Sequence, residues 1–177
     1  MNVFVLCTGR CGSMTFAEAC THITNFTSAH ESLSHTIGTD RLAYPPQHIE
    51  IDNRLSWFLG RLDQQYGDDA VYVHLTRDAA QVAQSFLKRW DSGIISAYRR
   101  EIIMGEHSNA TPYDTCVDYI HTVNSNIAFF LKDKPHALSV ALESFEHDFL
   151  DFWNHIGATG DINSALKELR TPHNASA

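Results

Sequence analysis

Residues 3–15 read VFVLCTGRCGSMT, an apolar run that breaks into a glycine-containing turn. The run Val3–Leu6 is typical of a buried strand, and the turn after it opens a helix. A turn and a helix N-terminus together point backbone N–H groups at one place, which suits an anion. Arg10 adds a fixed positive charge to this turn, while Ser13 and Thr15 add hydroxyl donors. The stretch therefore predicts an anion site at the end of a buried strand.

Strand and helix patterns alternate along the chain. We expect strands at 2–7, 23–29, 70–75 and 137–142, and helices at 12–22, 49–66, 78–90, 92–104, 112–132, 144–156 and 161–169. Strands separated by helices predict an α/β fold with three layers, in which helices flank a central parallel sheet. Ligands of such sheets bind beyond the carboxyl ends of the strands.

The composition predicts one folded domain over residues 1–177 rather than a disordered chain. The chain is 44% hydrophobic and 11% aromatic, and its formal net charge is -8. This charge disfavours general affinity for nucleic acid or for an anionic membrane. A site for an anion must therefore gather several of the 13 lysines and arginines in one place.

The four cysteines form no C-x-x-C pair, which favours free thiols in a reducing compartment over a zinc ribbon. The first apolar run is too short for a signal peptide, and no run is long enough to cross a membrane. We therefore expect a cytoplasmic protein without a metal site.

A second arginine follows another strand. The apolar run at 70–75 leads into Thr76-Arg77, and Asp78 is typical of a residue that caps the next helix. Two arginines, each placed after a strand of one parallel sheet, favour a doubly phosphorylated nucleotide as the ligand. Lys88, Arg89, Arg99 and Arg100 widen this positive field, meet an anionic acceptor or form a solvated basic face, of which the solvated face is the preferred interpretation.

Two common nucleotide sites fit these residues less well. A P-loop kinase needs G-x-x-x-x-G-K-[ST], but only two residues separate Gly9 from Gly12 and no lysine follows. The strand that ends at Thr76-Arg77 also lacks the acidic residue that would hold Mg²⁺. A dinucleotide-binding Rossmann site needs a third glycine, although Glu31 follows about 20 residues on, where such a fold has its ribose-binding acid. That alternative stays open.

A third interpretation explains more of the residues. Thr8-Gly9-Arg10-Cys11-Gly12-Ser13 resembles the 5′-phosphosulfate loop of sulfotransferases that use PAPS (3′-phosphoadenosine 5′-phosphosulfate). The stretch from Val73 to Ser85 resembles the 3′-phosphate motif of the same family, in which an arginine ends a strand and a serine follows on the next helix. Arg77 and Ser85 reproduce that spacing. The resemblance extends loosely over the first ninety residues, and residues 170–174 are weakly similar to the family's C-terminal contacts.

The resemblance implies a P-loop NTPase-like sulfotransferase fold and transfer of a sulfuryl group from PAPS, without a required metal, to a hydroxyl or amine. Arg10 would neutralise charge on the leaving oxygen, and Arg77 and Ser85 would bind the 3′-phosphate. The 5′-phosphate would lie against the loop residues, which are Gly9, Arg10, Cys11, Gly12, Ser13, Met14 and Thr15. Met14 stands where many members have a second hydroxyl, and the chain is short for the family.

The acceptor hydroxyl or amine must lose a proton, and Glu31 is the first candidate for the base, as in the tyrosylprotein-type sulfotransferases. His30 and His35 are the next candidates. The acceptor could be a small molecule, a glycan or a peptide. Two other functions stay open: a protein that binds PAPS or its product PAP without catalysis, and an atypical P-loop nucleotide kinase.

Overall fold

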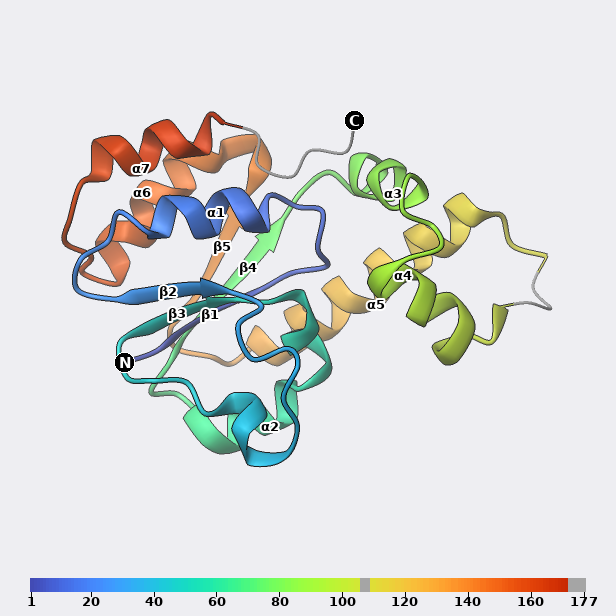
Figure 1. The fold of residues 1–177 in the computed structure, drawn as a ribbon, viewed down its shortest axis with the longest axis horizontal. Coiled ribbons are helices and arrows are strands. Elements are labelled where there is room, and N and C mark those ends of the chain that lie inside the picture. Colours follow the sequence, from blue (N-terminus) through green and yellow to red (C-terminus); the bar gives the residue numbers. More distant parts are fainter. Residues whose placement is uncertain (106–108, 172–177) are drawn as a thin grey trace.

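The computed structural model describes residues 1–105 and 109–171. Within them, five parallel strands form one sheet in the order β2-β3-β1-β4-β5 (Figure 1). The strands are β1 (Val3–Leu6), β2 (Thr27–His30), β3 (His48–Ile51), β4 (Val71–Thr76) and β5 (Ala137–Ala141). The predicted α/β class, with a central parallel sheet flanked by helices, is confirmed.

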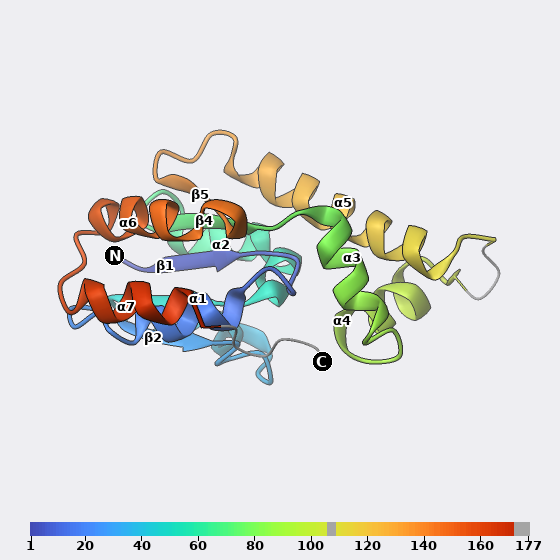
Figure 2. The same ribbon diagram turned by 90° about the horizontal axis from the view of Figure 1, so that it is seen from above.

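Helices cover both faces of the sheet (Figures 1 and 2). One face carries α1 (Ser13–Cys20), α6 (Phe145–His155) and α7 (Ile162–Leu169). The other carries α2 (Leu59–Tyr66) and α5 (Pro112–Leu131). The short helices α3 (Ala79–Leu87) and α4 (Gly93–Ala97) follow β4 and pack beside α5, beyond the sheet.

The central strand β1 is buried on both faces. Val3 and Val5 pack into the layer under α1, α6 and α7, while Phe4 and Leu6 pack into the layer with α2 and α5. All four side chains are fully buried. A short continuous apolar run is typical of a parallel strand with helices on both sides, so β1 forms where the sequence predicts it.

The connections diverge at the carboxyl end of β1. The chain leaves β1 through α1 toward β2, and it later passes from β3 through α2 to β4, on the other side of β1. Because the two connections run in opposite directions, they place α1 and α2 on opposite faces. Such a divergence leaves a crevice beyond the strand ends, where α/β sheets bind ligands. A Rossmann sheet has β2 beside β1, whereas here β3 lies there.

The helix predicted over residues 49–66 is wrong in its first part, because that part contains β3. Ile49 and Ile51 face the layer under α1. The alternate residues His48, Glu50 and Asp52 point the other way and are nonetheless buried. A 3₁₀ turn follows at Asn53–Trp57, and only then does α2 begin. The apolar residues of the turn and of α2 continue from Ile51 at a helical spacing, which explains the error.

The buried polar face of β3 is hydrogen-bonded within the protein. Arg41 pairs with Asp52 at 2.5 Å between Nη2 and Oδ2. Ser32 donates to both carboxylate oxygens of Glu50, from its N–H at 2.7 Å and from its hydroxyl at 2.6 Å. The His48 ring lies 3.0 Å from the same carboxylate. Polar groups can be buried at low cost only when they are paired in this way.

Smaller differences concern element boundaries. The strand predicted at 23–29 forms at Thr27–His30, and Ile23 makes only an isolated bridge to Gly160. The helix predicted at 92–104 divides into α4 and one π-helical turn, Tyr98–Ile102. No helix in the described part of the chain is both long enough and apolar enough to span a bilayer.

Candidate functional site

The loop between β1 and α1 contains three residues with left-handed backbone conformations. The φ angles are 81° at Gly9, 61° at Arg10 and 89° at Gly12. A Cβ atom on Gly12 would lie 2.8 Å from Leu142 Cδ1, so a larger residue here would force the Leu142 side chain to move. Such a conformation is costly for a side chain like that of Arg10, and strained residues of this kind cluster at functional sites.

Helix α1 begins directly after this loop, at Ser13, with Gly12 as its N-cap residue. No acidic residue lies in its first turn. The N–H groups of a first helical turn have no acceptors within the helix, and they carry partial positive charge. The loop and α1 therefore form a helix N-terminus whose N–H groups suit an anion, as the sequence predicts.

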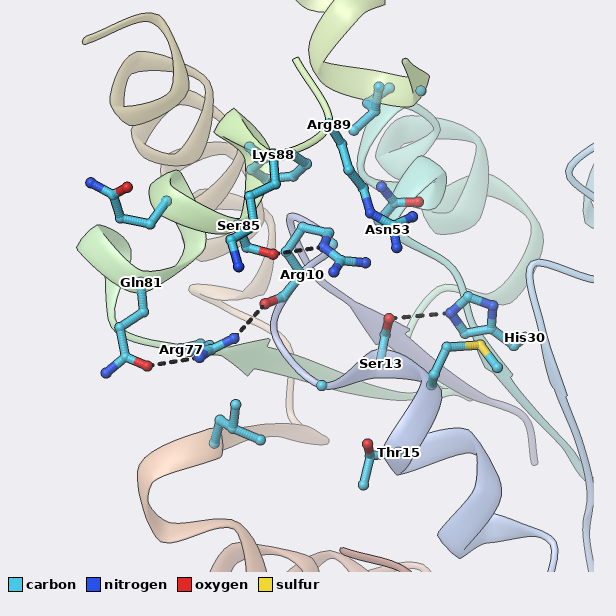
Figure 3. Close-up of a pocket in the computed structure, with 18 of the residues that line it drawn as sticks. Arg10, Ser13, Thr15, His30, Asn53, Arg77, Gln81, Ser85, Lys88 and Arg89 are labelled. Atoms are coloured by element: carbon cyan, nitrogen blue, oxygen red, sulfur yellow. Dashed lines mark hydrogen bonds between the residues drawn. The ribbon is translucent and has the colours of Figure 1, made fainter. Parts of the chain in front are cut away.

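The Arg10 side chain lies in a positive environment. Its Nε donates to the Ser85 hydroxyl at 2.9 Å, which joins the first loop to α3 (Figure 3). Burial lowers the pKa of the Arg10 guanidinium, and the charges of Arg89 and Arg77 lower it further. Three guanidinium groups that destabilise one another's charge are stabilised by an anion between them.

Arg77 follows the last residue of β4 and reaches back to the same loop. Its Nη1 donates to the backbone oxygen of Arg10 at 3.3 Å, and its Nη2 donates to Gln81 Oε1 at 2.7 Å. Its Nε is buried and has no hydrogen-bond partner among the described residues. A buried charged donor without a partner is costly, and an acceptor atom supplied by a ligand beside it would remove that cost.

The ends of β2 and β3 supply a different group of side chains. His30 Nε2 lies 3.2 Å from the Ser13 hydroxyl. Glu31 Oε2 lies 2.5 Å from Arg54 Nη1, and that same Nη1 lies 3.4 Å from Asn53 Oδ1. Glu31 also has a left-handed backbone, with φ at 52°. These residues place a carboxylate and an imidazole near the start of α1.

All of these residues line one pocket of about 890 Å³. This volume lies within the usual range for small-molecule sites. Among its described lining residues are six basic side chains and one carboxylate, which is Glu31. The basic side chains are Arg10, Arg54, Arg77, Lys88, Arg89 and Arg170. In a protein with a net charge of -8 this concentration of positive charge indicates an anionic ligand.

The structure brings together most of the predicted site residues. Gly9, Arg10, Gly12, Ser13, Met14, Thr15, Glu31, Arg77 and Ser85 all line the pocket. Cys11 does not: its side chain is fully buried in the core under α1, so it could meet a ligand only through its backbone. Thr15 is largely buried, at 6% exposure. Of the two further candidates for the base, His30 lines the pocket and His35 is exposed outside it.

Several lining residues were not predicted as site residues. Asn53 and Arg54 were missed because the sequence predicted a helix there, whereas they follow the end of strand β3. Lys88 and Arg89 could have been predicted from their spacing. They share one helical face with Gln81 and with Ser85, which the sequence already assigned to the site. Arg170 and Thr171 line the pocket, but residues 172–174 of the predicted C-terminal contact lie outside the described residues.

An acidic residue does follow the strand beside β1, since β3 leads into Asp52. Its carboxylate is fully buried, binds Arg41 through one oxygen and accepts the N–H of Arg54 at 2.7 Å through the other. Both oxygens are therefore engaged within the protein. Across residues 1–105 and 109–171, no cluster of three or more His, Cys, Asp or Glu side chains is arranged to hold a metal ion.

The pocket thus combines the N-terminus of α1, converging arginines and a carboxylate at the divergence point of a parallel sheet. Comparison of the chain with models of protein families, with curated proteins and with solved structures gives no match. The residues of the pocket themselves therefore carry the functional conclusion.

Proposed function

We propose that this chain binds PAPS and transfers its sulfuryl group to an acceptor hydroxyl or amine, on a P-loop-type sulfotransferase fold. The observation that best supports the proposal is the contact between the two arginine motifs. They lie 67 residues apart in the sequence, yet Arg77 hydrogen-bonds to the Arg10 backbone and Arg10 to the Ser85 hydroxyl. One ligand with two phosphate groups would explain why both motifs line one pocket.

The residues present fit the two phosphates of such a donor. The start of α1, Ser13 and Arg10 would hold the 5′-phosphosulfate, because N–H groups, a hydroxyl and a guanidinium converge there. Arg77 and Ser85 would hold the 3′-phosphate. The buried Nε of Arg77 supports this assignment, because it lacks an acceptor in the described protein.

The chemistry needs charge stabilisation and a proton acceptor. PAPS supplies a sulfuryl group, whose bond to the 5′-phosphate oxygen breaks as a new bond from sulfur to the acceptor oxygen or nitrogen forms. The departing phosphate gains negative charge, which Arg10 would neutralise. The acceptor proton passes to a base on the protein, for which Glu31 is the first candidate and His30 the second.

One observation favours a second function, which is binding without transfer. The Glu31 carboxylate already pairs with Arg54 at 2.5 Å, so one of its oxygens is engaged by a guanidinium. If this pair prevents Glu31 from taking up the acceptor proton and His30 does not replace it, the pocket would hold PAPS or PAP without transfer and act as a sensor of these nucleotides.

Calorimetry in metal-free buffer with PAP, AMP and ATP tests the proposal. PAP should bind at least about tenfold more tightly than AMP, because only PAP has a group for Arg77, and a hydrogen bond to a charged group contributes about 1.5–3 kcal/mol. Equal affinity for PAP and AMP would overturn the proposal. Tight binding of ATP that requires Mg²⁺ would favour a kinase instead.

A further inference from the structure

The pocket has two halves that differ in chemistry. The loop after β1 lies between them, because β1 is flanked by β3 on one side and by β4 on the other. The half beside β4 carries Arg77 and Ser85, which the proposed function assigns to the donor. The half beside β3 carries the residues at the ends of β2 and β3, which are His30, Glu31, Asn53 and Arg54. An acceptor would lie in this second half, next to the candidate bases.

The acceptor half has few apolar side chains in its lining. Four apolar residues of the described lining come from α3, α4 or the turn after β5, and they are Ala80, Phe86, Ile94 and Leu142. On the other side Met14, from the first turn of α1, and Leu169, at the end of α7 that packs on α1, add apolar side chains. Sites for phenols or other apolar compounds are lined mainly by hydrophobic and aromatic side chains. This half therefore suits a hydrophilic acceptor.

The groups that do line the acceptor half form hydrogen bonds and ion pairs. The Glu31 carboxylate, the Asn53 amide and the His30 ring are suited to hydroxyl groups. Arg54 binds Glu31 and Asn53 through Nη1. A guanidinium has five N–H donors, so Arg54 can bind a second anion while it keeps these contacts.

Arg89 adds positive charge on the same side. It follows α3, and its side chain extends toward Arg10 and Asn53 rather than toward Arg77 (Figure 3). The charge of Arg89 acts on the Arg10 guanidinium more strongly than that of Arg77 does. Two guanidiniums against one carboxylate leave the acceptor half positive, which attracts an anion and repels an amine.

We propose that the acceptor is a hydroxylated acid, which presents a hydroxyl to Glu31 or His30 and a carboxylate or phosphate to Arg54 and Arg89. This inference rests on the proposed function. The acceptor oxygen forms its bond to sulfur, the bond between sulfur and the 5′-phosphate oxygen breaks, and the hydroxyl proton moves to the base. The anionic group stays unchanged and serves to orient the hydroxyl.

The test uses the full chain saturated with PAP, so that only the acceptor half is free. Four probes are titrated by calorimetry: glucuronate, glucose, glucosamine and 4-nitrophenol. The first three share a hydroxylated ring and differ in charge, and the fourth is an apolar hydroxyl compound. Glucuronate should bind at least about tenfold more tightly than glucose, and glucosamine and 4-nitrophenol should bind no better than glucose. Glucose 6-phosphate then distinguishes a phosphate from a carboxylate as the preferred anion.

Two variants test whether Arg89 and Arg54 bind the anionic group of the acceptor. Arg89→Gln should abolish most of the preference for glucuronate over glucose, since its side chain is exposed and its loss should not impair folding. Arg54→Gln should do the same. Arg100→Gln removes a positive charge outside the pocket and should leave the preference unchanged.

The outcomes separate this inference from the proposed function. If PAP binds but glucuronate binds no better than glucose, or 4-nitrophenol binds best, the donor assignment stands and the acceptor class is wrong. The inference also fails if none of the probes binds to the PAP-loaded protein, or if the preference survives in both arginine variants. If PAP itself does not bind, the proposed function is overturned and this inference with it.

Discussion

Arg77 Nη1 donates a hydrogen bond to the backbone oxygen of Arg10, 3.3 Å away, and so joins the ends of two neighbouring strands. The contact uses one of the five N–H donors of the guanidinium, and Gln81 accepts a second. The side chain is therefore oriented before a ligand arrives, which lowers the entropy that binding must remove. Such an orientation makes Arg77 the most informative residue to change.

Replacing Arg77 should affect affinity for PAP far more than affinity for AMP. Arg77→Ala should weaken PAP binding by at least about tenfold, because a charge-assisted contact is lost. Arg77→Lys keeps the charge but not the planar guanidinium, so its PAP affinity should lie between that of the wild type and that of Arg77→Ala. Calorimetry with both nucleotides measures this, with Arg100→Ala as the control. A uniform loss for PAP and AMP would mean that Arg77 does not read the 3′-phosphate.

Gly12→Ala should destabilise the protein and impair nucleotide binding. A left-handed backbone costs an alanine about 1–2 kcal/mol, and the contact at 2.8 Å with Leu142 adds an overpacking cost of about 1–3 kcal/mol. Gly157 is a matched control, since it also has positive φ but no atom lies within 4 Å of its Cβ position. Gly157→Ala should therefore lower the free energy of unfolding only by the cost of a left-handed alanine backbone, about 1–2 kcal/mol. Urea unfolding compares the two variants, and equal losses would show that the close approach to Leu142 is unimportant.

Glu31→Gln separates binding from chemistry. If Glu31 is the base, turnover should fall by about 10²–10⁴, while PAP affinity should stay nearly constant because the base contacts the acceptor. His30→Gln provides the comparison, since His30 lines the same half of the pocket. Transfer of labelled sulfate to a hydroxyl acceptor measures both variants. Full turnover in Glu31→Gln with loss in His30→Gln would assign the base to His30.

His74 should make the folded state less stable in mild acid. Burial lowers the pKa of the His74 ring, although the nearby Asn124 amide oxygen, at 3.1 Å, opposes this. The unfolded chain therefore takes up a proton at about pH 6.5 that the folded protein resists. The contribution of this residue to stability is present above that pH and is lost as the pH falls.

Unfolding free energies measured between pH 8 and pH 5 check this sign. His74→Gln should fall less in stability over that range than the wild type does. His147→Gln is the control, because the His147 side chain is largely exposed. An unchanged pH dependence in His74→Gln would assign the acid sensitivity to other groups.

The sequence predicted the structure best where a short stretch of neighbouring residues was enough to define an element. The run Val3–Leu6 is apolar on both faces, so its burial in a parallel sheet follows from composition alone. Arg10 and Arg77 directly follow such runs, and parallel strands bring their carboxyl ends to one edge. For this reason the meeting of these two arginines at one pocket could be expected from the chain.

The sequence was least predictive where burial depends on distant partners. Glu50 and Asp52 are fully buried because Ser32 and Arg41 bind them, and a local pattern shows neither partner. When these partners are not known, the charged residues of the strand look solvent-exposed, and the pattern predicts a surface helix instead. The missed strand also concealed Arg54, and with it the ion pair to Glu31.

The bonded polar face of β3 also bears on how the protein folds. Glu50 and Asp52 would be costly to bury before Ser32 and Arg41 arrive, so β3 gains little by joining the sheet alone. The segment from Ser32 to Arg41 and the strand should therefore become ordered together, in one cooperative unit with the turn that bears Arg54. Local opening of that segment would release the acceptor half of the pocket as a whole, and its amide protons should report one common free energy of opening in hydrogen exchange.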